Sequence, residues 1–461
     1  MSLIVSIVLA RILVPDDYSV VSIVAIFFSF SSVVISGGFS SALIQKKDAD
    51  ELDFSSVTTL TILISAIVYL ILFICAGWIS EIYGKELLVP VIRVMGLVLF
   101  VDAYKSILCA HVSRRLEFKK FFISTIGGTI VSAIVGIVMA LRGFGPWALV
   151  AQQMTNSVID TLILSISTGF RPKFSVSLKR LKSLFSFGGK IYLASIITVI
   201  YDEIKPLIVG VKYSATDLAY YDKGSSFPKV LNSSISQTLS AVMFPVISKI
   251  QDDKEAVKNM ARNFMQVGSY LVFPLMAGFF SVADSFVSVV LTDKWLPIVP
   301  YIRIFCVSYM LNIITTGNLQ AIQAIGRSDI ILKLEITKKL SYLVIIASFV
   351  FLSKTPVILA VSDIACAVLA CILNSYPNRK LIGYRYRELL KDLALNLVSA
   401  VAMGLVVMSM SSLRINKLWL LVLQVLAGVV VYLLISLVTR NRNFLKLLGY
   451  AKEILGKEKA K

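Results

Sequence analysis

Long apolar stretches alternate along the whole chain with short polar connections. A helix needs about 20 apolar residues to cross roughly 30 Å of hydrocarbon. With that window the sequence predicts thirteen membrane-spanning helices, at Val20–Gly38, Val57–Ile79, Leu88–Ala110, Phe121–Leu141, Trp147–Thr168, Ile191–Val211, Leu218–Val242, Phe264–Val287, Pro297–Ala324, Leu334–Leu352, Pro356–Leu373, Leu393–Met410 and Leu418–Val438.

The first residues are apolar, but only ten precede Arg11, too few to cross a bilayer. They have neither the basic start nor the small-residue cleavage site of a signal peptide. We interpret this stretch as the outer end of a first span that is truncated here. The expected total is therefore about fourteen transmembrane helices in an all-α membrane protein.

Composition excludes a water-soluble protein. Of the 461 residues, 57% are hydrophobic and 16% charged, whereas soluble domains carry about 25% charged residues. The net charge of +19 belongs to basic residues dispersed between apolar runs, which argues against nucleic acid as a partner and favours contact with anionic lipids. Five scattered cysteines and one histidine predict no metal site.

The distribution of basic residues predicts the orientation. With an even number of spans and the N-terminus inside, the inner connections hold 32 Lys and Arg residues and the outer connections hold seven. Cytoplasmic connections of membrane proteins carry this excess. Both termini are therefore expected on the cytoplasmic side.

Two segments of the chain resemble each other. Val89–Val94 (VPVIRV) matches Val299–Ile304 (VPYIRI) at an interval of 210 residues, and Val8–Tyr18 resembles Val209–Ala219. A period of that length covers six spans, so the two copies have the same orientation. Such parallel repeats enclose a central cavity in transporters and give alternating access by rocking.

These patterns predict five regions. They are a lobe of six spans over 1–168, a cytoplasmic amphipathic linker over 169–190, a second lobe over 191–375, two further spans over 376–438 and a basic cytoplasmic tail over 439–461. In the linker, Leu178, Leu181, Leu184 and Phe185 share one helical face, which suits a helix lying in the headgroup layer.

Charged residues inside spans are costly unless they are paired or hydrated, so each is a functional candidate. Lys229 lies near mid-depth with no acidic residue three or four positions away, so it either meets an anion such as a lipid diphosphate or pairs across helices. The other candidates for substrate binding are Lys205, Lys223, Arg93, Arg303, Tyr220 and Tyr221. Snorkelling explains the two arginines equally well, and interfacial anchoring the two tyrosines.

The acidic candidates suggest ion coupling. Asp160 lies in the middle of a predicted span without a partner at helical spacing, and Asp102 is expected to pair with Lys105 three residues on. Asp202, Glu203 and Asp222 are the further candidates for coupling to a proton or sodium ion. No cofactor is expected.

Several stretches resemble polysaccharide-transport proteins of the multidrug/oligosaccharidyl-lipid/polysaccharide exporter superfamily, in the branch of the Wzx and teichuronic-acid flippases. They are LARILVPDDYSVVSI, GGFSSALIQKKD, LRGFGPWALVAQQ, LAYYDKGSSFPKV, MFPVISKIQDD and LTDKWLPIVPYIRI. The resemblance runs from Val5 to about Asn378. It departs at Lys205, where the family usually has an acidic residue, and in the roughly twenty residues that family members carry before Ser2.

The resemblance implies a flippase in the bacterial inner membrane that translocates undecaprenyl-diphosphate-linked oligosaccharides. Its product would serve O-antigen, capsule, exopolysaccharide or teichuronic acid synthesis, with glycosyltransferases and a polymerase as partners, and we expect a monomer. The alternative is a cation-coupled multidrug exporter of the same fold. An integral membrane glycosyltransferase or polymerase is the remote alternative, because the loop containing Asp48 and Asp50 and every outer loop are too short for an enzyme's site.

Overall fold

The computed structural model describes residues 2–36, 38–46, 48–172, 175–250, 253–413 and 415–445. The tail predicted over 439–461 lies outside the described residues from position 446 onward. The described chain is helical throughout and contains no strand. Its helices are α1 (Ser2–Ile12), α2 (Pro15–Ser36), α3 (Phe39–Gln45), α4 (Glu51–Tyr83), α5 (Leu88–Met95), α6 (Val98–Arg114), α7 (Phe118–Leu141), α8 (Pro146–Thr168), α9 (Leu178–Lys212), α10 (Ala215–Lys249), α11 (Lys254–Phe286), α12 (Val299–Ala324), α13 (Ser328–Leu352), α14 (Pro356–Leu381), α15 (Tyr386–Ser409) and α16 (Lys417–Val438).

Eight helical segments in the described part of the chain are long and apolar enough to cross a membrane. They contain α2, α4, α7, α11, α12, α14, α15 and α16. Of the other predicted spans, one coincides with α5 and α6, which are each shorter than a spanning helix. The rest coincide with α8, α9, α10 and α13, which carry more charged or polar residues. The all-helical membrane fold is thus confirmed, whereas the count of fourteen spans remains a prediction.

The span expected over Leu88–Ala110 is divided into α5 and α6. Gly96 stands at the break, where a Cβ atom would come within 2.6 Å of the Tyr69 ring on α4. Any larger residue would displace that ring, so the glycine permits the close approach of the two segments.

Helix ends follow local chemistry. Asp50 caps α4 by accepting a hydrogen bond from the Asp53 N–H, and Asp253 caps α11 by accepting from the N–H groups of Glu255 and Ala256. Pro146 and Pro356 occupy first helical positions in α8 and α14, where a missing N–H costs nothing. The two prolines are separated by the same 210 residues as the sequence repeat.

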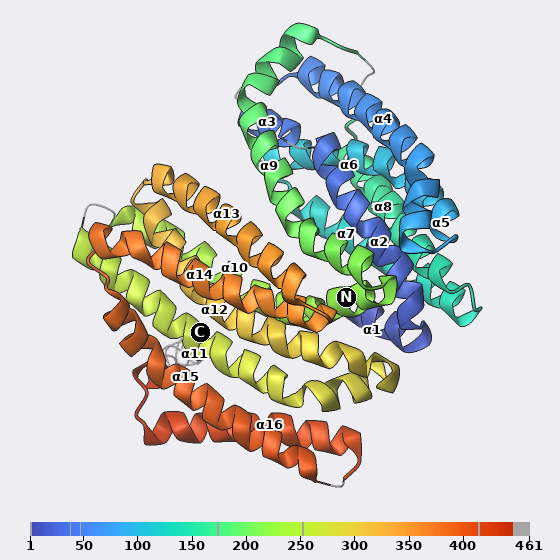
Figure 1. The fold of residues 1–461 in the computed structure, drawn as a ribbon. Coiled ribbons are helices and arrows are strands. Elements are labelled where there is room, and N and C mark those ends of the chain that lie inside the picture. The colour runs from blue at the N-terminus through green and yellow to red at the C-terminus, as the bar shows by residue number, and fades with distance from the viewer. Residues whose placement is uncertain are drawn as a thin grey trace, which may run out of the picture. The chain divides into compact units, whose positions relative to one another are not determined.

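The chain forms two compact units, Met1–Ala219 and Tyr220–Lys461, called the first and second unit below. In the first unit α7 packs along α8, α6 contacts α8 and α4, and α9 lies against α2, α3 and α4 (Figure 1). In the second unit α11 packs against α12, α15 and α16, and α14 lies between α12 and α13. The unit boundary lies within α10, whereas the lobes predicted over 1–168 and 191–375 stay a prediction.

Candidate transport site

Asp160 on α8 of the first unit has a partner that its sequence neighbourhood did not reveal. Its Oδ2 lies 2.7 Å from the Nζ of Lys105 on α6, and its side chain is 5% exposed. The expected pair of Asp102 with Lys105 is wrong, because the carboxylate of Asp102 instead accepts a hydrogen bond from Ser157. Pairs across two packed helices depend on how the helices are rotated, which spacing within one helix does not determine.

Asp102 lines a cavity of about 490 Å³ between α2, α6 and α8. Asp102 is the one charged residue among the described residues that line it. The other polar lining residues are Ser29, Ser32, Ser36, Ser106 and Gln153. The first unit therefore holds a polar chamber with a single carboxylate on its wall.

The cluster predicted on neighbouring spans is divided between the units. Asp202, Glu203 and Lys205 lie on α9 in the first unit, where Lys205 is 5% exposed, Glu203 is half-buried and Asp202 is exposed. Asp222 and Lys223 lie on α10 in the second unit.

Tyr220, Tyr221 and Lys223 lie among aromatic rings of the second unit. Tyr221 is buried with its ring edge-on to Phe305, and its hydroxyl donates to Asp363 over 3.3 Å. Tyr220 packs edge-on against Trp295, Tyr221 also meets Tyr301, and the Lys223 Nζ lies 5.8 and 5.9 Å from the ring centres of Phe227 and Trp295.

Lys229 differs from these neighbours, because its side chain is exposed. No described residue forms a hydrogen bond or ion pair with it. Lys229 stands fifteenth of the 35 residues of α10, which puts it about 21 Å along the helix. The cross-helix salt bridge that the sequence left open does not form within the described residues.

Arg93 and Arg303 occupy equivalent surroundings in the two units. The Arg93 guanidinium lies 4.2 Å from the ring centre of Phe73 on α4, and the Arg303 guanidinium lies 5.5 Å from the ring centre of Phe280 on α11. Arg303 also pairs with Asp284. Both contacts are of the cation–π type, and they suit arginines near the membrane surface.

A second chamber, in the second unit, was not predicted. A cavity of about 230 Å³ lies between α12, α13 and α14, lined by Asn312, Asp363, Asn374 and Lys338 among others. Both side-chain polar atoms of Asn374 are buried without a hydrogen-bond partner. The internal repeat could have indicated this chamber, because Asn312 and Asp363 stand 210 residues after Asp102 and Gln153, which line the first chamber.

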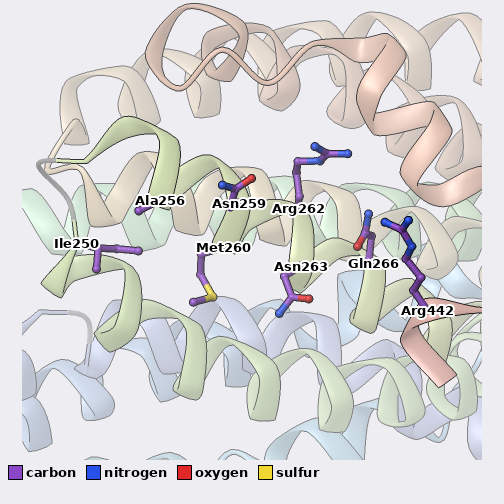
Figure 2. Close-up of a pocket in the computed structure, with 8 residues that line it drawn as sticks. All are labelled: Ile250, Ala256, Asn259, Met260, Arg262, Asn263, Gln266 and Arg442. Atoms are coloured by element: carbon purple, nitrogen blue, oxygen red, sulfur yellow. The ribbon is translucent and has the colours of Figure 1, made fainter. Parts of the chain in front are cut away.

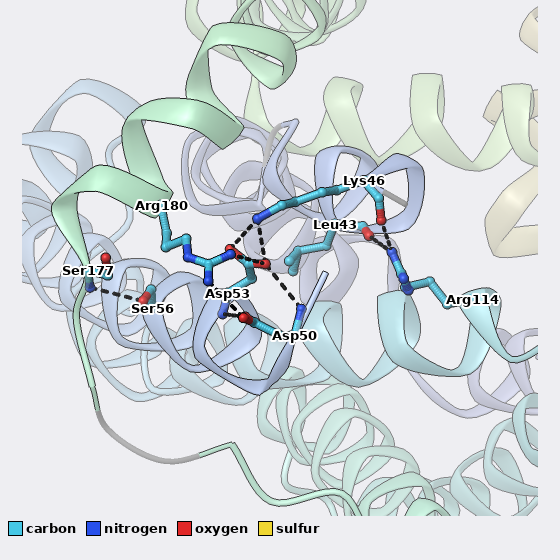
Figure 3. A network of polar contacts seen from close by, with 8 residues as sticks. All are labelled: Leu43, Lys46, Asp50, Asp53, Ser56, Arg114, Ser177 and Arg180. Carbon is cyan, nitrogen blue, oxygen red and sulfur yellow. Dashed lines mark hydrogen bonds and ion pairs between the residues drawn. The ribbon is translucent and has the colours of Figure 1, made fainter. Parts of the chain in front are cut away.

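A polar network fastens the start of α9 to α4 (Figure 3). It lies at the end of the first unit that the sequence predicts to face the cytoplasm, and the ends predicted to face the cytoplasm are called inner ends below. Arg180 donates to Asp50 over 2.9 Å, and Lys46 lies 2.6 Å from the buried carboxylate of Asp53. The N–H of Asp53, followed by the nearby charge of Arg180, lowers the pKa of Asp50. Asp50 thus stays ionised and keeps its hold on Arg180.

The same fastening corrects the prediction for the linker. Leu181 and Leu184 are buried in a cluster with Phe39 and Leu43 of α3, whereas Leu178 and Phe185 are exposed. Half of the expected apolar face is therefore covered by protein instead of headgroups. The segment continues without a break into α9.

The inner end of the second unit has a comparable fastening. Arg262 on α11 forms two hydrogen bonds of 2.7 Å with Asp392 on α15, and Lys258 lies 2.8 Å from Glu388. An adjoining cavity of about 530 Å³ is lined by polar residues of α11 and by Arg442 (Figure 2). Its lining is mainly amide and guanidinium groups.

Comparison with known proteins identifies the family. The model for the family described as "Polysaccharide biosynthesis protein" matches residues 8–300, more than half of the chain. The chain belongs to this polysaccharide biosynthesis protein family.

Relatives and solved structures agree with the family. An uncharacterised membrane protein in the cps region of Klebsiella pneumoniae is 25% identical, over 97% of this chain and 93% of its own length. The lipopolysaccharide biosynthesis protein WzxC of Escherichia coli is 23% identical, over 72% of this chain and 68% of its own length. The lipid II flippase MurJ, in an inward closed conformation, matches with a TM-score of 0.76 and 15% identity over 95% of this chain and 97% of its own.

The comparisons confirm the resemblance and the membrane fold. This member of the polysaccharide biosynthesis protein family is a multi-pass membrane protein. No group of three or more potential metal-ligating side chains occurs in the described part of the chain.

Proposed function

We propose that this protein flips undecaprenyl-diphosphate-linked oligosaccharides from the cytoplasmic to the outer face of the bacterial inner membrane during polysaccharide synthesis. Membership of the polysaccharide biosynthesis family supports the pathway, and the names of WzxC and of the flippase MurJ support the reaction. The observation in this chain that carries the proposal is the exposed Lys229 deep in α10.

An unpaired ammonium at this depth is unfavourable unless an anion or water meets it. A diphosphate crossing the membrane concentrates negative charge where the dielectric constant is low, so a lysine there stabilises it more than one at the surface. Lys229 has no described carboxylate partner that would have to be displaced first. Its ammonium is therefore available to the diphosphate.

The second unit also offers a surface for a long hydrocarbon chain. An apolar cavity of about 430 Å³ lies between α11, α15 and α16, with lining residues that include Leu271, Leu275, Val425, Val429 and Leu433. A hydrocarbon chain that enters from the bilayer exchanges one apolar environment for another, so its contact with this lining is not opposed by desolvation of polar groups. A lipid carrier suits this cavity better than a free sugar does.

The proposed cycle is alternating access between the lobes 1–168 and 191–375, with both termini in the cytoplasm and a single copy of the chain. Asp160, Asp202, Glu203 and Asp222 are the proposed groups for coupling to protons or sodium ions. We assign no catalytic role, and the partners proposed are the glycosyltransferases and polymerase that make and use the lipid-linked oligosaccharide.

Complementation of a bacterium lacking its own flippase tests the proposal. Lys229→Ala should abolish surface polymer while the protein remains in the membrane at normal level, because the diphosphate loses its counter-charge. Lys229→Arg should keep part of the output, because the charge remains but its geometry changes. The measurement is surface polysaccharide per cell, normalised to membrane-embedded protein.

Lys333→Ala is the matched control, because the side chain of Lys333 is also exposed and without a described partner but lies in the first two turns of α13, in a segment that the sequence predicts to be an inner connection. It should leave polymer output unchanged. Normal output from a well-expressed Lys229→Ala variant would contradict the proposal. Efflux of cationic drugs together with no polymer from the wild type would favour the exporter instead.

A further inference from the structure

The carboxylate of Asp102 stands apart from the other intramembrane acids of the first unit. It lies on the wall of the chamber between α2, α6 and α8, and its contact is with the hydroxyl of Ser157. Among the described residues no cation lies within ion-pair distance of Asp102. The nearby Lys105 pairs with Asp160. A half-buried carboxylate bound only to a hydroxyl gains from taking up a proton.

We propose that Asp102 is the proton-carrying group of the first unit, taking a proton from water in the chamber and returning it there. The inference rests on the proposed transport function, because it names the ion that drives it. The step is a transfer from hydronium to a carboxylate oxygen, which leaves a neutral carboxylic acid and a water molecule. It needs no other reactant.

The charges around Asp102 support one exchangeable proton. The cluster on α6 and α8 contains two carboxylates, Asp102 and Asp160, and one ammonium, Lys105, so it carries one negative charge when all three are ionised. One oxygen of Asp160 is buried without a hydrogen bond, so no further protein donor offsets that charge. Protonation of Asp102 makes the cluster neutral, which is the cheaper state in a low-dielectric region.

The surroundings favour Asp102 over Asp160 as the acceptor. Lys105 forms its ion pair with Asp160, whereas Asp102 has no ion pair among the described residues. The polar groups that α2 contributes to the chamber are the hydroxyls of Ser29, Ser32 and Ser36. On α8, Ser157 donates its hydroxyl to Asp102, and the uncharged Gln153 lines the same chamber. A chamber of about 490 Å³ with this polar lining has room for the water that delivers the proton.

The internal repeat gives independent support. The residue 210 positions after Asp102 is Asn312, which lines the chamber of the second unit. Asparagine has nearly the shape of a protonated aspartate, and its amide stays uncharged at every physiological pH. Asn312 in the second unit is thus always neutral, whereas Asp102 in the first unit becomes neutral only by binding a proton.

Infrared difference spectroscopy of the purified full-length protein, between about pH 9 and pH 5, tests the assignment directly. Acidification should produce a carboxylic acid C=O band that is missing from Asp102→Asn and present, at a shifted frequency, in Asp102→Glu. Asp363→Asn in the other chamber is the matched control and should retain the band. The protein needs no substrate, so the result does not depend on transport.

Three outcomes would overturn the assignment. They are a band that survives in Asp102→Asn, a protein that shows no such band, and a band that sodium chloride removes at constant pH when choline chloride does not. The last result would make the chamber a sodium site. The proposed function is tested separately, by the polymer output of the wild type in the complementation assay. That output can be normal even if the infrared assignment of Asp102 is wrong.

Discussion

The helix pairs α6–α8 and α12–α14 occupy equivalent positions in the repeat but place their polar residues at different depths. In the first unit the Lys105–Asp160 and Asp102–Ser157 contacts lie toward the middle of the helices, and the C-terminal part of the pair is the apolar cluster of Leu108, Val112 and Leu164. In the second unit the C-terminal part of the pair holds a buried amide network. It consists of Asn318, Ser375 and Asn378, with hydrogen bonds of 2.7 to 3.1 Å.

The difference teaches that the repeat preserves the helix pair but not the interactions that hold it. At the interval of 210 residues, Asp160 corresponds to Ala370 and Asn318 corresponds to Leu108. Uncharged amides can be buried once they are satisfied, whereas an ion pair leaves ionisable groups inside the protein. The Lys105–Asp160 ion pair therefore has no counterpart between α12 and α14, where Thr315 and Ala370 stand at the equivalent positions.

Removing Asp160 from its ion pair with Lys105 should have the largest effect on stability. Asp160→Ala leaves Lys105 without its carboxylate and should lower the free energy of unfolding by about 3 kcal/mol, since an unpaired partly buried charge remains. Unfolding in a detergent titration measures this. Adding Lys105→Met should recover most of the loss, and Asp329→Ala at the exposed Arg327 pair should change nothing. No loss in Asp160→Ala would show that water already solvates Lys105.

Breaking the amide network should cost less. Asn318→Leu installs the residue of the first unit and removes the side chain that bonds Ser375 and Asn378, whereas Asn378 keeps its hydrogen bond to the Asn318 backbone carbonyl. We therefore expect a loss of about 1 to 2 kcal/mol. The reverse exchange, Leu108→Asn, should also destabilise, because it puts an unsatisfied amide into an apolar cluster. The same titration measures both. Stability gained in either variant would refute the idea that each pair is adapted to its own residues.

The capped helices α4 and α11 allow a finer comparison. Asp253→Ala removes two hydrogen bonds to the first turn of α11 and should cost about 1 kcal/mol. Asp50→Ala should lower the unfolding midpoint further, because it also removes the ion pair with Arg180. Equal losses would mean that this ion pair adds nothing.

The cation–π contacts should give the smallest effects. Phe73→Leu removes the ring under Arg93 and should cost about 0.5 kcal/mol, and Phe280→Leu should cost less because Arg303 keeps Asp284. Thermal unfolding of the two variants side by side compares them. A larger loss in Phe280→Leu would reverse the ranking.

The helices could be predicted from the sequence because apolar length and charge placement are local properties. The helix starts at Pro146 and Pro356 agree within one residue with the starts of the predicted spans Trp147–Thr168 and Pro356–Leu373. The equivalence of Arg93 with Arg303 follows from the repeated segment. The partner of Asp160 could not be predicted, because a contact between two helices depends on their rotation. The same limit applies to Leu181 and Leu184, whose pattern predicts an apolar face but not whether protein or lipid covers it.

The ion pairs at the inner ends have a consequence for synthesis of the chain. Arg180 meets Asp50 across a separation of 130 residues, and Glu388 and Asp392 meet Lys258 and Arg262 across the same 130 residues. At about 5–20 residues per second, each set of first-made charges waits roughly 6 to 26 s for its partner to leave the ribosome. The ion pairs at the two inner ends can therefore form only after the same delay. In the first unit the acidic residue is synthesised before its basic partner, and in the second unit the basic residues are synthesised before their acidic partners.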